Sequence, residues 1–127
     1  MKYLLDTHAF LWFIQNDNRL SDSMRTTIET NEYIYLSAVS LWEIAIKISI
    51  CKLNLKNKTI DDLFSACKDK SIAILNITSE HIKAVVDLPF IHRDPFDRML
   101  VAQAKVEDMT LITCEQYIPQ YPIKIVW

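Results

Sequence analysis

The chain has 127 residues, of which half are hydrophobic and 24% are charged, and its formal net charge is −2. This length suits one compact domain over residues 1–127. The near-neutral charge excludes a broad basic surface, so a nucleic-acid partner needs a local patch or metal ions to hold it. The absence of glycine excludes the P-loop and the G-x-G-x-x-G dinucleotide loop.

The cysteine residues and the N-terminal segment indicate the cellular compartment of the protein. The cysteines at 51, 67 and 114 are odd in number and show no C-x-x-C spacing, which favours a reducing environment. Asp6 and His8 interrupt the apolar start before a signal-peptide core is complete, and no run of about 18 apolar residues is present. We therefore expect a soluble, cytoplasmic protein with no membrane partner.

In the first half of the chain, short β-branched and aromatic runs alternate with segments that have helical apolar spacing. The expected elements are a strand over 3–5, a helix over 8–15, a helix from Ser21 to Asn31, a strand over 33–36 and a helix capped by Ser40. The last assignment places Glu43 in or near the first turn of its helix. In place of glycine, we expect asparagines to take positive φ in tight turns. These are Asn16, Asn18, Asn31, Asn54 and Asn57.

The second half continues the alternation. The expected elements are a helix over about 59–69, a strand over 72–77, a helix from Thr78 or Ser79 to before Pro89, a helix from Pro95 to about Asp108, a strand over 110–113 and an edge strand over 123–126. Strands that alternate with helices of this length predict an α/β fold. Specifically, we expect a three-layer α/β/α sandwich with a mostly parallel central sheet.

Four acidic residues are expected at the carboxyl-terminal edge of this sheet, where ligands bind in parallel α/β folds. Asp6 follows the first strand, Glu43 lies after the second, Asp97 opens the helix before the fourth, and Glu115 follows the fourth. Taken singly, an acid in a first helical turn is explained by about 0.3–1 kcal/mol of favourable interaction with the helix dipole. Asp6 is harder to explain, because an acid that ends a buried strand is desolvated. The coincidence of all four favours a site.

Carboxylates brought within a few ångströms repel one another unless cations neutralise them. Mg²⁺ is the expected occupant because it prefers hard oxygen ligands from carboxylates, water and phosphate, and Mn²⁺ is expected to substitute for it. Such an ion lowers the pKa of a coordinated water, which attacks phosphorus in line. The sequence thus predicts a site for one or two metal ions. Its metal-binding and catalytic residues are Asp6, Glu43, Asp97 and Glu115.

Other residues near these acids have simpler explanations. Trp12, Trp42 and Phe96 have helical spacing and are expected in the core rather than under a nucleobase. His8 and His92 are single histidines, which are usually neither bases nor ligands. Solvated surface charge is the default interpretation of the basic residues, with a phosphate backbone as the alternative. The basic residues concerned are Arg93, Arg98, Lys47 and Lys52.

Three segments carry longer motifs: Y-L-L-D-T-H-A-F-L-W over 3–12, S-A-V-S-L-W-E-I-A-I-K over 37–47 and H-R-D-P-F-D-R-M-L-V-A-Q-A over 92–104. In these motifs, and in the last segment over 110–127, the sequence resembles the PIN-domain ribonucleases, specifically the VapC-type toxins of bacterial toxin-antitoxin pairs. The matching segments reach nearly from end to end. The L-L-D-T start is a weak signal, whereas W-E-I-A-I-K and H-R-D-P-F-D-R at these separations are specific.

The resemblance implies a three-layer α/β/α fold, metal-dependent endonucleolytic cleavage of RNA, a homodimer, and a cognate antitoxin whose tail enters the active-site groove. By position, Asp6, Glu43 and Asp97 match the metal-site acids of the family. The residues that the resemblance implies for substrate binding or support of the site are Thr7, Asp94, Arg98 and Thr113.

Two positions depart from the family pattern. The family usually has threonine, any residue and aspartate after the fourth strand, but this chain has Thr113, Cys114 and Glu115. The fourth carboxylate is therefore longer by one methylene, which favours an outer, water-mediated role. Cys51 precedes Lys52 where the family often has glycine, so the local turn is in question.

The main hypothesis is an RNA endonuclease toxin in which Asp6 and Asp97 are the principal metal ligands and Glu43 orients the attacking water. An alternative, kept open by Glu115, is a catalytically silent PIN-like module that binds RNA or protein without cutting. A phosphatase with Asp6 as nucleophile is weaker, because such enzymes usually carry a second acid two residues later, where this chain has His8.

Overall fold

The computed structural model describes all 127 residues, and its centre is one five-stranded sheet in the order β3-β2-β1-β4-β5. The strands are β1 (Tyr3–Leu5), β2 (Ile34–Ser37), β3 (Ile72–Leu75), β4 (Thr110–Ile112) and β5 (Ile125–Val126). Every neighbouring pair is parallel. The predicted α/β fold class is confirmed, and the sheet is parallel throughout.

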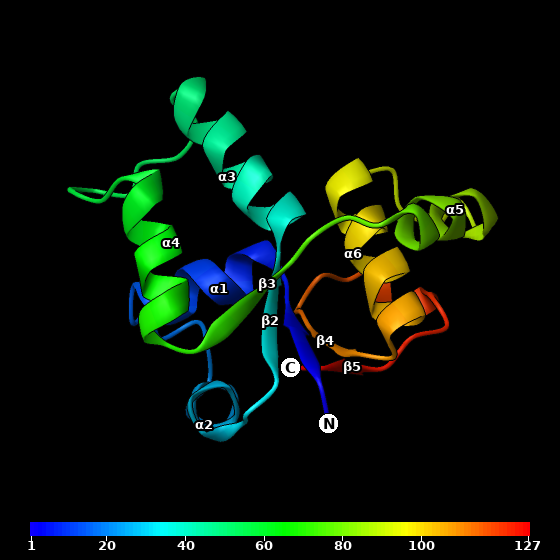
Figure 1. The fold of residues 1–127 in the computed structure, drawn as a ribbon, viewed down its shortest axis with the longest axis horizontal. Coiled ribbons are helices and arrows are strands. Elements are labelled where there is room, and N and C mark those ends of the chain that lie inside the picture. The colour runs from blue at the N-terminus through cyan, green and yellow to red at the C-terminus, as the bar shows by residue number, and fades with distance from the viewer.

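Helices cover both faces of the sheet. They are α1 (Thr7–Ile14), α2 (Asp22–Thr30), α3 (Ala38–Ser49), α4 (Ile60–Asp69), α5 (Ser79–Asp87) and α6 (Pro95–Glu107), with a 3₁₀ turn, η1 (Ile118–Gln120). Figure 1 shows α1 to α4 on one side of the strands and α5 and α6 on the other. None of these helices has the length and apolar character that crossing a lipid bilayer requires.

The central strand β1 is buried on both faces. Because successive side chains of a strand point to opposite faces, Leu4 packs among residues of α6 such as Leu100, whereas Leu5 packs among residues of α1 and α3 such as Phe10 and Ile44. Both leucines are fully buried, and each such burial contributes about 1.5–3 kcal/mol. This packing fixes the end of β1, from which the chain enters α1.

The strand register aligns the carboxyl-terminal ends of β1, β2 and β4. Leu5 pairs with Leu36 of β2 and with Ile112 of β4. The next residues along the chain, Asp6, Ser37 and Thr113, therefore stand side by side at the carboxyl-terminal edge of the sheet.

Helix α3 begins directly at the end of β2, earlier than predicted. Ser37 is its N-cap, and the Ser37 hydroxyl accepts a hydrogen bond from the backbone N–H of Val39 at 3.0 Å. The prediction that Ser40 caps this helix is wrong, because β2 continues to Ser37 and leaves no loop. Glu43 consequently lies in the second turn of α3 rather than the first.

Five residues adopt a positive φ, namely Asn16, Cys51, Lys56, Ser71 and Asp108. The prediction of a positive φ is confirmed for Asn16 and wrong for Asn18, Asn31, Asn54 and Asn57. Cys51 lies in the turn that the departure from the family's glycine puts in question, whereas nothing in the sequence indicates Lys56, Ser71 or Asp108. Four of the five residues, Asn16, Cys51, Ser71 and Asp108, follow the ends of α1, α3, α4 and α6, where a left-handed residue commonly ends a helix. Packing decides where each helix ends, and the residue that follows that end takes the left-handed conformation even when its side chain disfavours it.

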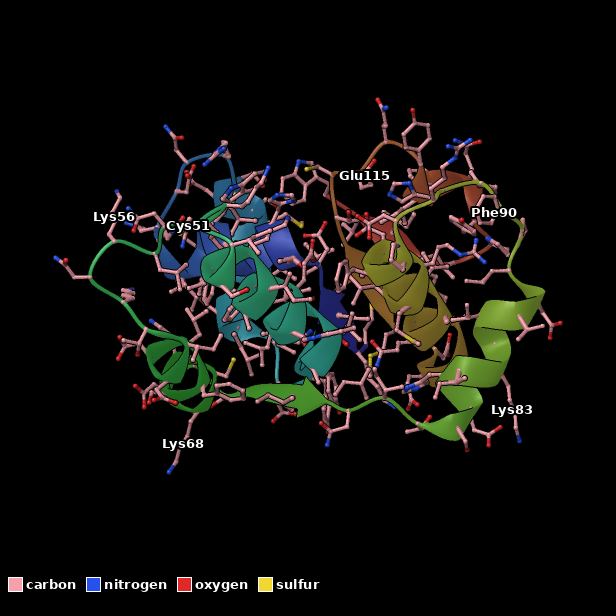
Figure 2. All side chains as sticks on the ribbon, turned by 90° about the horizontal axis from the view of Figure 1, so that it is seen from above. Cys51, Lys56, Lys68, Lys83, Phe90 and Glu115 are labelled. Carbon is pink, nitrogen blue, oxygen red and sulfur yellow. The ribbon has the colours of Figure 1, made fainter.

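Cys51 gives a test of this backbone strain. It has a φ of 57° in the loop after α3 (Figure 2), and a side chain with a Cβ atom costs about 1–2 kcal/mol in this region. We expect Cys51→Gly to raise the free energy of unfolding by about 0.5–1 kcal/mol, since glycine relieves the clash but adds entropy to the unfolded chain. Urea denaturation measures the difference, with Cys51→Ala as a control that removes the thiol and keeps the Cβ. Equal stabilities of the two variants would contradict the explanation.

Candidate active site

Asp6 is a buried carboxylate at the junction of β1 and α1, and it is 5% exposed. Its Oδ1 accepts a hydrogen bond from the backbone N–H of Ala9 at 2.7 Å, which caps α1. Burial raises the pKa of Asp6, while hydrogen bonds with the Thr113 side chain and the Ala9 N–H oppose this shift. Asp6 forms no ion pair with lysine or arginine. The only favourable charge that acts on Asp6 is that of His8.

Glu43 is held at both of its carboxylate oxygens. The Thr7 hydroxyl donates to Oε1 at 2.7 Å, and Lys47 Nζ lies 3.1 Å from Oε2. Thr7 Oγ1 is also hydrogen-bonded with Ser40 Oγ at 3.0 Å. These contacts join the start of α1 to α3 beside Asp6, and they fix the orientation of the Glu43 carboxylate.

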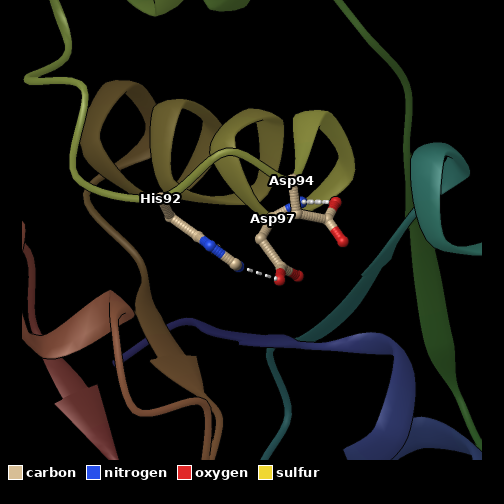
Figure 3. A group of neighbouring side chains, drawn as sticks. All are labelled: His92, Asp94 and Asp97. Carbon is tan, nitrogen blue, oxygen red and sulfur yellow. Dashed lines mark hydrogen bonds and ion pairs between the residues drawn. The ribbon is translucent and has the colours of Figure 1, made fainter.

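Asp97 lies in the first turn of α6, as predicted, within a group of three potential ligands. Asp94 is the N-cap of α6, and its Oδ1 accepts from the N–H groups of Phe96 and Asp97 at 2.8 and 3.2 Å. His92 Nε2 lies 2.8 Å from Asp97 Oδ2. Ligand atoms of His92, Asp94 and Asp97 all lie within 4.8 Å of one another, and Figure 3 shows the three side chains pointing to the same side of α6.

The environment of Asp97 disfavours its charged form. Burial is the main cause that raises the pKa of Asp97 to about 6. The hydrogen bond with His92 opposes this shift, whereas the charges of Asp94 and Glu43 add to it. Trp42, next to Glu43, packs against Phe96, next to Asp97, with ring centroids 5.4 Å apart, so the helices that carry these two acids are in contact.

Glu115 follows β4 and is half-buried. Its backbone N–H donates to Thr113 Oγ1 at 3.0 Å, and its Oε1 accepts from the N–H of Tyr117 at 3.4 Å. Asp6 and Glu115 line the same hollow of about 400 Å³, and the charge of Glu115 contributes to the raised pKa of Asp6. In Figure 2, Glu115 lies between α1 and α6.

Among the four predicted acids, only Asp97 belongs to the group of three ligand atoms within 4.8 Å of one another, which also includes His92 and Asp94. The other three acids lie around this group at the same edge of the sheet. The charge of Glu43 adds to the raised pKa of Asp97, and Asp6 and Glu115 line the same hollow. Glu43 and Asp6 are connected through Thr7, which follows Asp6 and donates to Glu43. Buried carboxylates with few cationic partners match the hard oxygen ligands that Mg²⁺ and Mn²⁺ prefer. The residues present thus fit a divalent cation.

Arg98 does not contact these acids. Its guanidinium donates to the carbonyl oxygens of Pro89 at 3.0 Å and Val85 at 3.3 Å, and to the Tyr121 hydroxyl at 3.3 Å. Tyr121 in turn accepts from the backbone N–H of His92 at 2.9 Å. Arg98 therefore fastens the segment between α5 and α6 that carries His92.

Two residues were misjudged from the sequence. The sequence favours no role for His92, yet it contacts Asp97, and its ring stacks on Tyr117 with centroids 5.3 Å apart. Trp42 was expected in the core, but it is 59% exposed and packs edge-on against Phe96. The proximity of His92 to the D-P-F-D motif was a usable signal. For Trp42, helical spacing alone did not reveal which face of α3 lies outward.

The comparison with protein families identifies this architecture. The model of the PIN domain family matches residues 3–124. This chain belongs to the PIN domain family. Residues 6, 43, 97 and 115 of this PIN domain all lie within the matched range, as do the supporting residues at 7, 94, 98 and 113.

Solved structures share the fold of this PIN domain at low sequence identity. VapBC2 from Rickettsia felis, bound to a DNA fragment from its promoter, has a TM-score of 0.75 and 14% identity, over 99% of this chain and 98% of that chain. DNA-bound VapBC from Salmonella typhimurium has a TM-score of 0.72 and 16% identity, over 99% and 97%. A toxin-antitoxin complex from Klebsiella pneumoniae has a TM-score of 0.70 and 15% identity, over 99% and 97%. None of the curated proteins matches the sequence significantly.

Proposed function

We propose that this PIN domain is a metal-dependent RNA endonuclease and the toxin of a toxin-antitoxin pair, of the VapC type. The observation that carries the proposal is the pair of acids Asp6 and Asp97, whose pKa values are raised by burial at the sheet edge. A folded protein tolerates such costly charges where they serve a function. The toxin-antitoxin complexes among the structures of similar fold support the biological context.

Asp6 and Asp97 would hold the divalent ion, with Glu43 and Glu115 beside them. When bound, Mg²⁺ or Mn²⁺ supplies Lewis-acid activation of water and stabilises charge on the phosphate. The protein supplies fixed geometry. Thr7 and Lys47 hold Glu43 so that it orients the attacking water, and capping by Asp94 aligns the first turn of α6.

Cleavage of single-stranded RNA by the purified protein tests this function. We expect the labelled RNA to be cut in Mg²⁺ or Mn²⁺ and to stay intact in excess EDTA. Expression in bacteria is expected to arrest growth, and co-expression of the cognate antitoxin, whose tail would enter the active-site groove, is expected to restore it. Full cleavage in EDTA would contradict the proposal.

A second candidate function is a catalytically silent PIN-like module that binds RNA or protein. Glu115 favours it, since its carboxylate is one methylene longer than aspartate and accepts from the Tyr117 N–H. Titration calorimetry with Mn²⁺ separates the two functions. Metal binding together with cleavage supports the nuclease, whereas RNA or antitoxin binding without metal binding supports the silent module.

We also propose that the protein is a homodimer through an exposed apolar surface. Large apolar side chains are exposed on α3, α4, β3 and the segments beside α5, namely Trp42, Phe64, Ile74, Ile77 and Phe90. Two hollows of about 430 and 360 Å³ adjoin this surface, and Trp42 lines both. β3 is an edge strand of the sheet. Exposed apolar surface of this kind is characteristic of protein interfaces.

Trp42 gives the test of this interface. We expect Trp42→Glu to convert the dimer into a folded monomer, because a charge at the centre of an apolar interface loses its hydration without gaining a partner. Light scattering coupled to size-exclusion chromatography measures the mass. Tyr33→Glu is the matched control, since Tyr33 is 52% exposed and precedes β2, at the opposite end of that strand from α3, which carries Trp42. A dimer that survives Trp42→Glu would place the interface elsewhere.

A further inference from the structure

Two hollows beside the acidic site share one wall. The first, of about 400 Å³, is lined by Asp6 and Glu115 among others. The second, of about 380 Å³, is lined by three basic residues, Arg19, Lys47 and Lys52. His8 and Trp12 line both hollows. Because these two residues are four apart on α1, they lie on the same face of the helix.

The second hollow offers positive charge to a polyanion. Lys52 is exposed and forms no ion pair, whereas Lys47 is partly engaged by Glu43. Arg19 is engaged by Asp17, at 2.7 Å. The hollow therefore presents Lys52 as its free cation, with Lys47 next to it. A phosphate is the kind of group that such a position attracts.

The wall between the hollows is aromatic and largely fixed. The Arg19 guanidinium lies 4.8 Å from the Trp12 ring centroid, and Trp127 packs edge-on against Trp12 at 5.6 Å. The His8 ring lies 5.6 Å from the Trp12 ring at an interplanar angle of 31°. Trp12 is thus occupied by its neighbours, whereas His8 is exposed and its only aromatic contact is with Trp12.

We propose that His8 is a stacking platform for a nucleobase of the RNA strand, and that Lys52 and Lys47 bind the phosphate beyond that base. The subsite rests on the proposed nuclease function, in which the scissile phosphate lies at Asp6 and Asp97. The scissile phosphate, the base of the adjacent nucleotide and the next phosphate would then lie at the acidic site, the aromatic wall and the basic hollow, in that order. The ligand is a single strand, because bases in a duplex are stacked on one another and have no free face.

The test is a thermodynamic cycle between protein and RNA, measured by fluorescence anisotropy. The protein carries Asp6→Asn to prevent cleavage, and asparagine keeps the N-cap of α1. The ligands are a series of short labelled RNAs, each with an abasic nucleotide at a different position. At one position next to the scissile phosphate, we expect the abasic site to weaken binding about fivefold or more. His8→Ala is expected to weaken binding of the intact RNA by a similar factor.

The decisive result is whether the effects of the abasic site and of His8→Ala on binding are non-additive. If the base stacks on His8, the abasic penalty at that position disappears in His8→Ala, and His8→Phe restores both affinity and penalty because it keeps a flat ring. Tyr33→Ala, which removes an exposed aromatic ring elsewhere, is expected to change nothing. An abasic penalty that stays the same in His8→Ala overturns the subsite while leaving the nuclease intact. Failure to bind RNA at all overturns the proposed function together with the subsite.

Discussion

Replacement of Asp6 or Asp97 by asparagine is expected to lower the rate of RNA cleavage by about a hundredfold or more. The protein is expected to stay folded. Each substitution removes a negative charge that the divalent ion requires and keeps the shape of the side chain. Asparagine caps a helix about as well as aspartate, so the bond from Ala9 N–H at position 6 is retained. At position 97, the amide oxygen still accepts a hydrogen bond from His92.

The same substitutions are expected to stabilise the metal-free protein. Both carboxylates are disfavoured by burial, and a neutral amide does not carry the cost of a desolvated charge. Initial rates of cleavage in Mg²⁺ and thermal unfolding in EDTA measure the two effects on the same samples. Asp108→Asn is the matched control, since Asp108 is exposed and left-handed, a conformation that asparagine tolerates. Loss of both activity and stability in Asp6→Asn would indicate a structural rather than a catalytic role.

The metal-free protein is expected to lose stability as pH rises, and divalent metal is expected to restore it. The pKa of Asp97 is about 6 in the folded protein, above its ordinary 3.8, and that of Asp6 is shifted in the same direction. Between these values the folded state binds more protons than the unfolded state, so the free energy of unfolding falls as pH increases. We expect a loss of about 1–2 kcal/mol, or several degrees in Tm, between about pH 4.5 and 7.5.

Thermal unfolding in EDTA at a series of pH values measures this loss. The pKa of Asp17 is lowered to about 2 by its hydrogen bonds with Arg19, so this group titrates below the window. Asp97→Asn is expected to flatten the profile. Mg²⁺ or Mn²⁺ is expected to raise Tm more at about pH 7.5 than at about pH 5, because protons compete with metal for the carboxylates. A profile that rises with pH in EDTA would show that these acids are stabilised rather than strained.

Local sequence rules predicted most of the elements, because their signals lie within a few neighbouring residues. Ser21 caps its helix as expected, Thr78 rather than Ser79 is the cap of α5, and Pro95 opens α6. Alternating strands and helices were sufficient for the parallel α/β fold. The start of α3 was missed because Ser37 and Ser40 are equally good caps, and only the length of β2, which is set by its pairing with β1 and β3, distinguishes them.

Some features of the candidate site likewise follow from the sequence, and others depend on the tertiary structure. The sequence alone determined the family motifs and the position of Asp6 and Asp97 next to a strand or at a helix start, since each depends on residues adjacent in the chain. The tertiary structure decided which side chains meet: Thr7 with Glu43, His92 with Asp97, and the exposed His8 against Trp12. It also turned Trp42 outward. The physical reason is that burial and contact depend on how helices pack on the sheet, and a periodic pattern in one segment does not specify the partner that covers it.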